Sequence, residues 1–132
     1  MLKMKFTIIT LFEDALRPYL ETSMMWKAAE KGIAEFDFVN LRDFGIGPHK
    51  SVDDTPYGGG DGMLLRCEPV YAAIESVVEK AKAAGEPRPE VILPTPDGMI
   101  WNQTLARQFA GVEKPDTSTK AIEESIAKKP AE

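Results

Sequence analysis

The chain has 132 residues, of which 43% are hydrophobic and 28% are charged, and this balance is typical of a single globular domain with its own core. Its formal net charge of −5 argues against nucleic-acid binding through bulk positive charge alone, although it leaves room for a local basic patch. A single cysteine, Cys67, and a single histidine, His49, exclude an internal disulfide and a four-ligand zinc site of the usual kind.

The first apolar run covers residues 5–12 and is rich in β-branched and aromatic side chains. It is too short to span a membrane, and no small-residue cleavage site follows it. We therefore expect a strand buried on both faces, no membrane association and a cytoplasmic location.

A helix is predicted next, from Glu13 to about Lys31, with Pro18 interrupting its early part and Gly32 stopping it. Alternation of apolar side chains then predicts a second strand over residues 34–41.

The second half of the chain predicts two further helices. Apolar residues recur at helical spacing after Glu68, and Gly85 marks the end of that helix. A short strand over residues 91–93 and a turn over residues 94–98 follow, and Asn102 is placed to cap a last helix from Gln103 to about residue 110. The alternating order predicts an α/β fold, with a mostly parallel sheet and flanking helices.

Glycines and carboxylates dominate the tract over residues 42–63. Glycine carries the largest backbone entropy cost, so three in succession indicate either a mobile surface loop or a place where a ligand approaches the main chain. The tract does not match a Walker loop, because Met63 and not Gly-Lys follows Gly62, and it lacks the third glycine of a dinucleotide fingerprint.

Other polar residues nearby leave alternatives open. Adjacent Asp53 and Asp54 point to opposite sides of an extended segment, so we expect one to brace the loop and the other to be solvated. Cys67 is more consistent with a buried structural thiol than with a reactive one. The loops over residues 58–62 and 94–98 both follow a strand and precede a helix, which predicts that they line one crevice.

The order of the motifs is specific. The chain reads RDF from Arg42, HK from His49, VDD from Val52, PYGGG from Pro56 and GM from Gly62. This order resembles the bacterial tRNA (guanine-N1)-methyltransferase family of the SPOUT superfamily, whose fold is an α/β domain with a deep trefoil knot.

The resemblance covers about residues 4–111. Glu13 departs from the proline usual in that family, and the ILPTPDG segment from Ile92 resembles its first cofactor-binding loop with Pro94, Thr95 and Asp97 as variants.

The resemblance implies transfer of a methyl group from S-adenosylmethionine to N1 of the guanosine just 3′ of the anticodon, in a homodimer that binds tRNA and not DNA. It places cofactor contacts at Leu93, Pro94, Thr95, Pro96 and Gly98. It places contacts to the target base or the tRNA at Tyr57, Gly58, Gly59, Gly60, Gly62, Arg42, His49 and Lys50. Such a reaction needs a base for the N1 proton and a donor near O6.

The family's catalytic Arg and Asp lie in segments that this sequence does not match. We therefore expect a partial SPOUT domain over residues 1–111, truncated before the knot is completed, and a polar tail over residues 112–132 with a short helix as one alternative. The isolated chain is expected to bind the cofactor weakly and to be inactive. A non-catalytic dimerisation or RNA-interaction module and an inactive remnant are the alternative functions.

Overall fold

The computed structural model describes residues 3–111, so the predicted tail and its helix lie outside the described residues. The chain divides into two compact units, Met1–Val91 (unit 1) and Ile92–Glu132 (unit 2). Each unit is described by itself.

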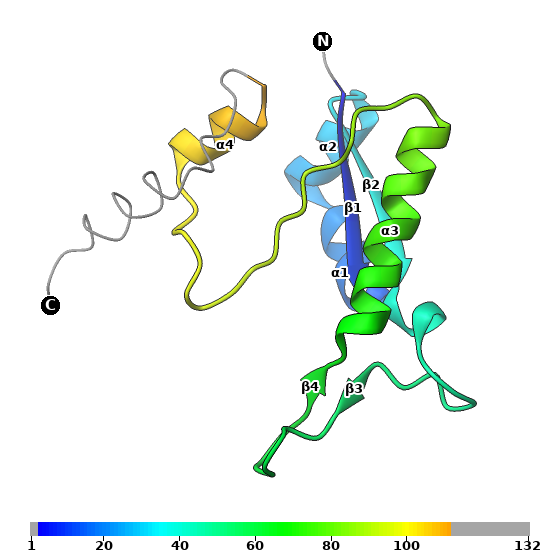
Figure 1. Cartoon of the computed structure of the whole chain (residues 1–132). Coiled ribbons are helices and arrows are strands. Elements are labelled where there is room, and N and C mark those ends of the chain that lie inside the picture. The colour runs from blue at the N-terminus through cyan, green and yellow to red at the C-terminus, as the bar shows by residue number, and fades with distance from the viewer. Residues whose placement is uncertain (1–2, 112–132) are drawn as a thin grey trace, which may run out of the picture. The chain divides into compact units, whose positions relative to one another are not determined.

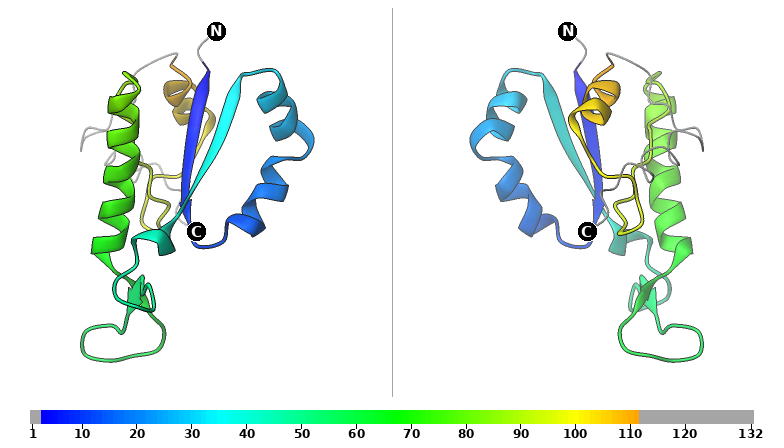
Figure 2. Two further views of the ribbon diagram at one scale, coloured as in Figure 1. Left: turned by 90° about the vertical axis from the view of Figure 1, so that its right-hand side faces the viewer. Right: turned by 90° about the vertical axis from the view of Figure 1, so that its left-hand side faces the viewer.

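Unit 1 is built on a small parallel sheet. Strand β1 (Met4–Thr10) pairs in parallel with β2 (Ala34–Asn40), in a register that runs from Met4 opposite Ala34 to Thr10 opposite Asn40. Helices α1 (Glu13–Leu20) and α2 (Ser23–Glu30) lie on one side of the sheet, and α3 (Cys67–Ala83) lies on the other (Figure 1, Figure 2). The predicted α/β class is confirmed, with both strands close to their predicted positions.

The helix predicted over residues 13–31 is two helices, and Pro18 lies inside α1 instead of interrupting it. The break comes at Thr22, whose backbone is extended and whose hydroxyl donates a hydrogen bond to the carbonyl of Tyr19 at 2.8 Å. Ser23 then takes a positive φ of 51°. A threonine that bonds to a nearby carbonyl competes with the helical pattern, which explains the break.

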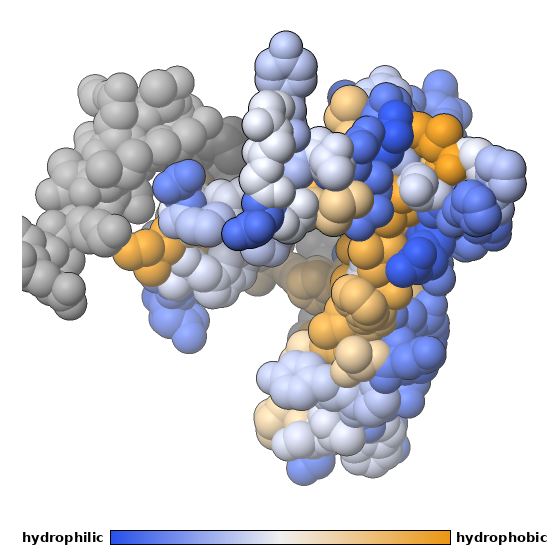
Figure 3. Space-filling view, turned by 90° about the horizontal axis from the view of Figure 1, so that it is seen from below, coloured by the Kyte–Doolittle hydropathy of each residue, from blue (hydrophilic) through white to orange (hydrophobic). Residues whose placement is uncertain are grey.

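Strand β1 is not buried on both faces, so that expectation was wrong. Phe6 is 42% exposed, although its ring stacks on Phe36 of β2 at a centroid distance of 5.5 Å. In the part of the chain that the structure describes, the sheet has two strands, so each has a single hydrogen-bonded neighbour and neither is central. Apolar atoms consequently reach the surface (Figure 3).

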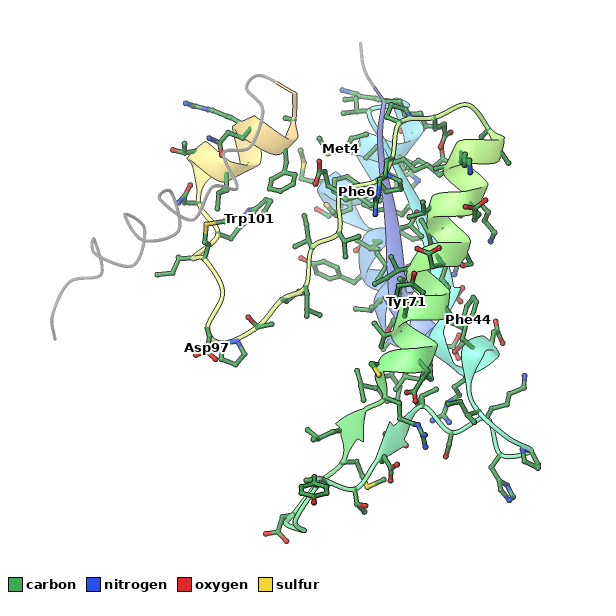
Figure 4. All side chains as sticks on the ribbon, viewed as in Figure 1. Met4, Phe6, Phe44, Tyr71, Asp97 and Trp101 are labelled. Atoms are coloured by element: carbon green, nitrogen blue, oxygen red, sulfur yellow. The ribbon has the colours of Figure 1, made fainter. Side chains whose placement is uncertain are left out.

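The core of unit 1 lies where α3 meets the 3₁₀ helix η1 (Leu41–Phe44). Leu41, Val52 and Ala73 are almost fully buried there. The half-buried side chains around them are Ile9, Leu11, Val39, Phe44 and Val70. Figure 4 shows Phe44 beside α3. Because Ala73 has only a methyl group and no exposed surface, α3 lies close against η1.

Unit 2 contains helix α4 (Gln103–Phe109), capped as predicted: the Asn102 Oδ1 atom accepts a hydrogen bond from the Leu105 amide at 3.0 Å. The Trp101 ring stacks on that of Phe109 at 5.6 Å. None of the helices over residues 3–111 has the length and apolar character that crossing a bilayer requires.

The strand predicted over residues 91–93 is absent. These residues belong to none of the described ladders, and their side chains are 59%, 56% and 75% exposed. Three apolar residues in succession predict a strand only if a neighbouring strand hydrogen-bonds to them, and the structure gives them no such neighbour within the described residues.

Candidate functional site

The glycine-rich tract forms an antiparallel ribbon, defined here as residues 52–66. Strand β3 (Asp53–Asp54) pairs with β4 (Leu64–Leu65), a ladder that the sequence did not predict. The ribbon connects η1 to α3 and extends beyond the carboxyl ends of β1 and β2 (Figure 1). Ligands of α/β proteins bind at this edge of the sheet, so its position suits a binding element.

The tip of the ribbon, residues 55–63, is open. Tyr57 is fully exposed, and Gly58, Gly59, Gly60 and Gly62 have φ values of 87°, 81°, 132° and 89°. A Cβ atom built on any of these four glycines would meet nothing within 4 Å. The glycines are therefore required for the left-handed backbone and not for packing within this chain, and the space beside them is free for a ligand.

The root of the ribbon, Val52 and Arg66, is fixed. Val52 is 2% exposed within the core, and its carbonyl accepts a hydrogen bond from the Arg66 amide at 2.8 Å. The Asp54 carboxylate accepts a hydrogen bond from the Thr55 amide at 2.8 Å and another from the Arg66 guanidinium at 3.3 Å. Asp54 thus braces the loop, as expected for one of the two aspartates, whereas Asp53 is half-buried and not fully solvated.

The predicted basic residues come from two adjacent elements. Arg42 lies on η1, where its amide donates to the Asn40 side chain at 3.0 Å, and His49 and Lys50 lie on a turn closed by paired hydrogen bonds between Ile46 and Ser51 at 2.8 and 3.0 Å. All three basic side chains are exposed. The Lys50 Nζ atom is 3.9 Å from an Asp43 carboxylate oxygen, so part of its charge is neutralised locally.

Gly45 is a residue whose importance the sequence analysis missed. A Cβ atom there would lie 2.3 Å from the carbonyl carbon and oxygen of Lys50, a distance that real Cβ atoms do not reach. Lys50 itself has a positive φ of 48°. Only glycine at position 45 lets the turn fold back against η1. The sequence feature that could have identified Gly45 is its position directly after the RDF motif.

Cys67, predicted to be buried, is exposed. It is the first residue of α3, where the helix begins at the surface, and its thiol lies 3.5 Å from the Glu68 carboxylate. The pKa of Glu68 is held below its usual range, first by a hydrogen bond from its own backbone amide and then by the Cys67 thiol, with the Arg66 charge adding to both. No group of His, Cys, Asp and Glu among residues 3–111 is arranged to hold a metal ion.

In unit 2, the predicted cofactor loop is a tight turn over residues 95–98. The Gly98 amide donates to the Thr95 carbonyl at 3.1 Å, with Pro96 and Asp97 at the two central positions (Figure 4). A Cβ atom on Gly98 would lie 3.2 Å from the Thr95 carbonyl and hydroxyl oxygens, so glycine keeps this turn tight. Leu93 and Pro94, just before the turn, are exposed. Because this turn and the ribbon belong to different units, the crevice expected between them stays a prediction.

Comparisons with known proteins agree on one family. The model of the family described as tRNA (Guanine-1)-methyltransferase TrmD matches residues 4–115. A tRNA (guanine-N(1)-)-methyltransferase of Thermus thermophilus is 44% identical over 110 residues, which make up 83% of this chain and 43% of that protein. The enzyme of the same name from Gloeothece citriformis is 46% identical over 107 residues, which cover 81% of this chain and 44% of that protein.

A solved structure shares the fold. The crystal structure of tRNA (m1G37) methyltransferase from Aquifex aeolicus superposes with a TM-score of 0.69 at 34% sequence identity, covering 82% of this chain and 46% of that one. The chain thus spans less than half the length of the relatives that it matches. With a family model matching most of its residues, the chain belongs to the tRNA (guanine-1)-methyltransferase family.

Proposed function

We propose that this chain takes part in the transfer of a methyl group from S-adenosylmethionine to N1 of the guanosine 3′ of the anticodon in tRNA. The observation that carries the proposal is the open glycine ribbon at the carboxyl edge of the parallel sheet, in a chain of this family. An enzyme that acts on N1 of a purine must take that base out of its stack, and the base needs a space free of side chains. The four glycines of the tip leave such a space.

Two sets of residues have separate proposed roles, one in binding RNA and the other in binding the cofactor. Arg42, His49 and Lys50 lie exposed near the root of the ribbon, where cations and hydrogen-bond donors hold phosphates and fix the position of the RNA. The turn over residues 95–98 suits a cofactor, because Gly98 keeps the turn tight and the neighbouring Leu93 and Pro96 are exposed and offer apolar surface to an adenine ring. S-Adenosylmethionine, when bound, supplies the electrophilic methyl group.

The same proposal includes the family's wider features. We infer that residues 1–111 form part of a domain of the SPOUT, or trefoil-knot, methyltransferase class, and that the active assembly is a cytoplasmic homodimer that acts on tRNA and not on DNA. The 132-residue polypeptide by itself is expected to bind S-adenosylmethionine weakly and to transfer no methyl group, because it has no match to the family's catalytic Arg and Asp.

RNA binding by the ribbon provides the main test. A fluorescent anticodon stem-loop is titrated with the 132-residue chain at fixed salt, with guanosine or adenosine at the position 3′ of the anticodon. We expect tighter binding of the guanosine form, and we expect Gly59→Val to weaken binding at least about fivefold, because a branched side chain at a φ of 81° distorts the tip and occupies the space beside it.

Gly32→Val is the matched control, since Gly32 also has a positive φ, 66°, and open space around it but lies at the end of α2. Equal binding of the two RNAs together with equal effects of Gly59→Val and Gly32→Val would overturn the proposed role of the ribbon. Labelled methyl transfer from S-adenosylmethionine to unmodified tRNA, measured with the same chain, tests the expected inactivity.

A further inference from the structure

The geometry points to Arg66 as a positioning residue that holds the glycine ribbon in a fixed orientation relative to α3, by bridging Asp54 on the ribbon and Glu68 on the helix. This inference deepens the proposed function and rests on it, because it concerns how the tip is presented to RNA. It assigns no catalytic role to Arg66.

Arg66 lies at the junction of two elements. It directly follows β4 and is the N-cap residue of α3, so its backbone belongs to both the ribbon and the helix start. In the ladder Asp54 is opposite Leu64, which makes Arg66 its diagonal neighbour on the same face. The Arg66 Nη1 atom is 3.3 Å from the Asp54 carboxylate, and the Nε atom is 3.8 Å from the Glu68 carboxylate.

Beyond its root, where Val52 is buried and the Arg66 amide donates to the Val52 carbonyl, the ribbon has little else to fix its direction. Each of its strands has two residues, and an isolated two-stranded ribbon is marginally stable in water. Beyond the ladder, the backbone hydrogen bond found within the tip joins the Gly59 amide to the Pro56 carbonyl at 3.0 Å. A weak exposed ion pair therefore suffices to bias the orientation, although it adds little to global stability.

The guanidinium suits this bridge better than an ammonium. Its planar fork presents several donors at once and therefore reaches two carboxylates from one side chain, whereas a lysine is a single point charge. The Arg66 side chain is 31% exposed, against 63% for Asp54 and 58% for Glu68, so the cation is the most enclosed of the three groups.

Hydrogen–deuterium exchange of the ribbon amides measures this bridge without RNA. In the 132-residue chain we expect Arg66→Gln and Asp54→Asn each to speed exchange over residues 52–66 by about three- to fivefold, the range set by an exposed ion pair. The double variant should exchange no faster than Arg66→Gln alone, because Arg66→Gln already removes the contact that Asp54→Asn removes. Arg66→Lys should retain part of the protection.

Lys82→Gln is the matched control. It removes one positive charge and the exposed Lys82–Glu79 pair, 3.9 Å long, from α3 without touching the ribbon. We expect it to leave exchange over residues 52–66 unchanged.

Binding of the anticodon stem-loop then distinguishes the effect of ribbon orientation from the effect of net charge on RNA affinity. Asp54→Asn removes a negative charge, so electrostatics alone predicts tighter RNA binding, whereas loss of the bridge predicts binding about two- to fivefold weaker. Weaker binding by Asp54→Asn, with faster ribbon exchange, supports the positioning role.

Two results would overturn it: unchanged exchange in both single variants, or Asp54→Asn binding RNA as tightly as the wild type or more tightly. A failure of the proposed function is distinct from these, because the wild-type chain would then not bind the stem-loop while the exchange measurement would still decide whether Arg66 holds the ribbon.

Discussion

The root and the tip of the glycine ribbon are opposite in character. At the root, Val52 packs with Leu41 and Ala73, and all three are at most 4% exposed. At the tip, Tyr57 is fully exposed, and a Cβ atom on any of the four glycines around it would meet nothing within 4 Å. A fixed base that carries an open loop is how binding loops are commonly built, since a scaffold places the loop while the loop itself remains available to a partner.

Truncation of a core side chain that packs against the root is expected to have the largest effect. Leu41→Ala leaves a cavity beside Val52 and Ala73 and should lower the free energy of unfolding by about 2–5 kcal/mol. Leu64→Ala, the same change on the ribbon at a residue that is 59% exposed, should cost less than about 0.5 kcal/mol. Urea unfolding of both variants measures the difference, and similar losses would show that the root is not the core.

Two glycine substitutions compare the stability cost of a steric clash with the cost of a positive φ alone. Gly45→Ala places its Cβ atom 2.3 Å from the Lys50 backbone and should cost about 1–3 kcal/mol. Gly59→Ala meets no atom within 4 Å and carries only the penalty of its positive φ, about 1 kcal/mol. Urea unfolding should therefore rank Gly45→Ala as the more destabilised, and the reverse ranking would contradict the close approach of the turn.

Lowering the pH should produce the smallest effect on stability, and it should act through Glu68, on α3 next to the root. Because the pKa of Glu68 is lowered in the folded chain, its contribution to stability is present above the ordinary glutamate pKa of about 4.3 and is lost as the pH falls through the lowered folded value. Glu68→Gln should flatten this part of the stability curve. Urea midpoints recorded across that pH range check the expectation, and superimposable curves for the two proteins would contradict it.

Much of the fold could be predicted from local chemistry. The two strands, the stops at Gly32 and Gly85 and the cap at Asn102 each depend on a few neighbouring residues, and the structure confirms them. The elements that were wrong or missed depend on residues distant in the sequence. A strand at residues 91–93 requires a pairing partner, and a ladder of two residues per strand is too short to show alternation.

In the candidate site, too, local sequence features could be predicted, whereas contacts between distant residues could not. The order of motifs identified the family, and the family comparison confirms it. The assignment of the glycine tract and of the turn over residues 95–98 to the site stays a prediction. The pair between Arg66 and Asp54 joins residues 12 positions apart, and the contact between Gly45 and Lys50 requires a left-handed lysine. Neither contact has a signature in a single sequence, because each is created by the way in which the chain turns back on itself.

The methyl group of Ala73 has a consequence for how this chain can vary. It fills the narrow space between α3 and η1, and α3 begins directly where the ribbon ends. A valine or leucine at this position would push the helix axis outward and swing the glycine tip with it. The size of a fully buried residue therefore influences where the glycine tip points, so variation at position 73 is expected to alter the proposed RNA affinity without any change in the tip itself.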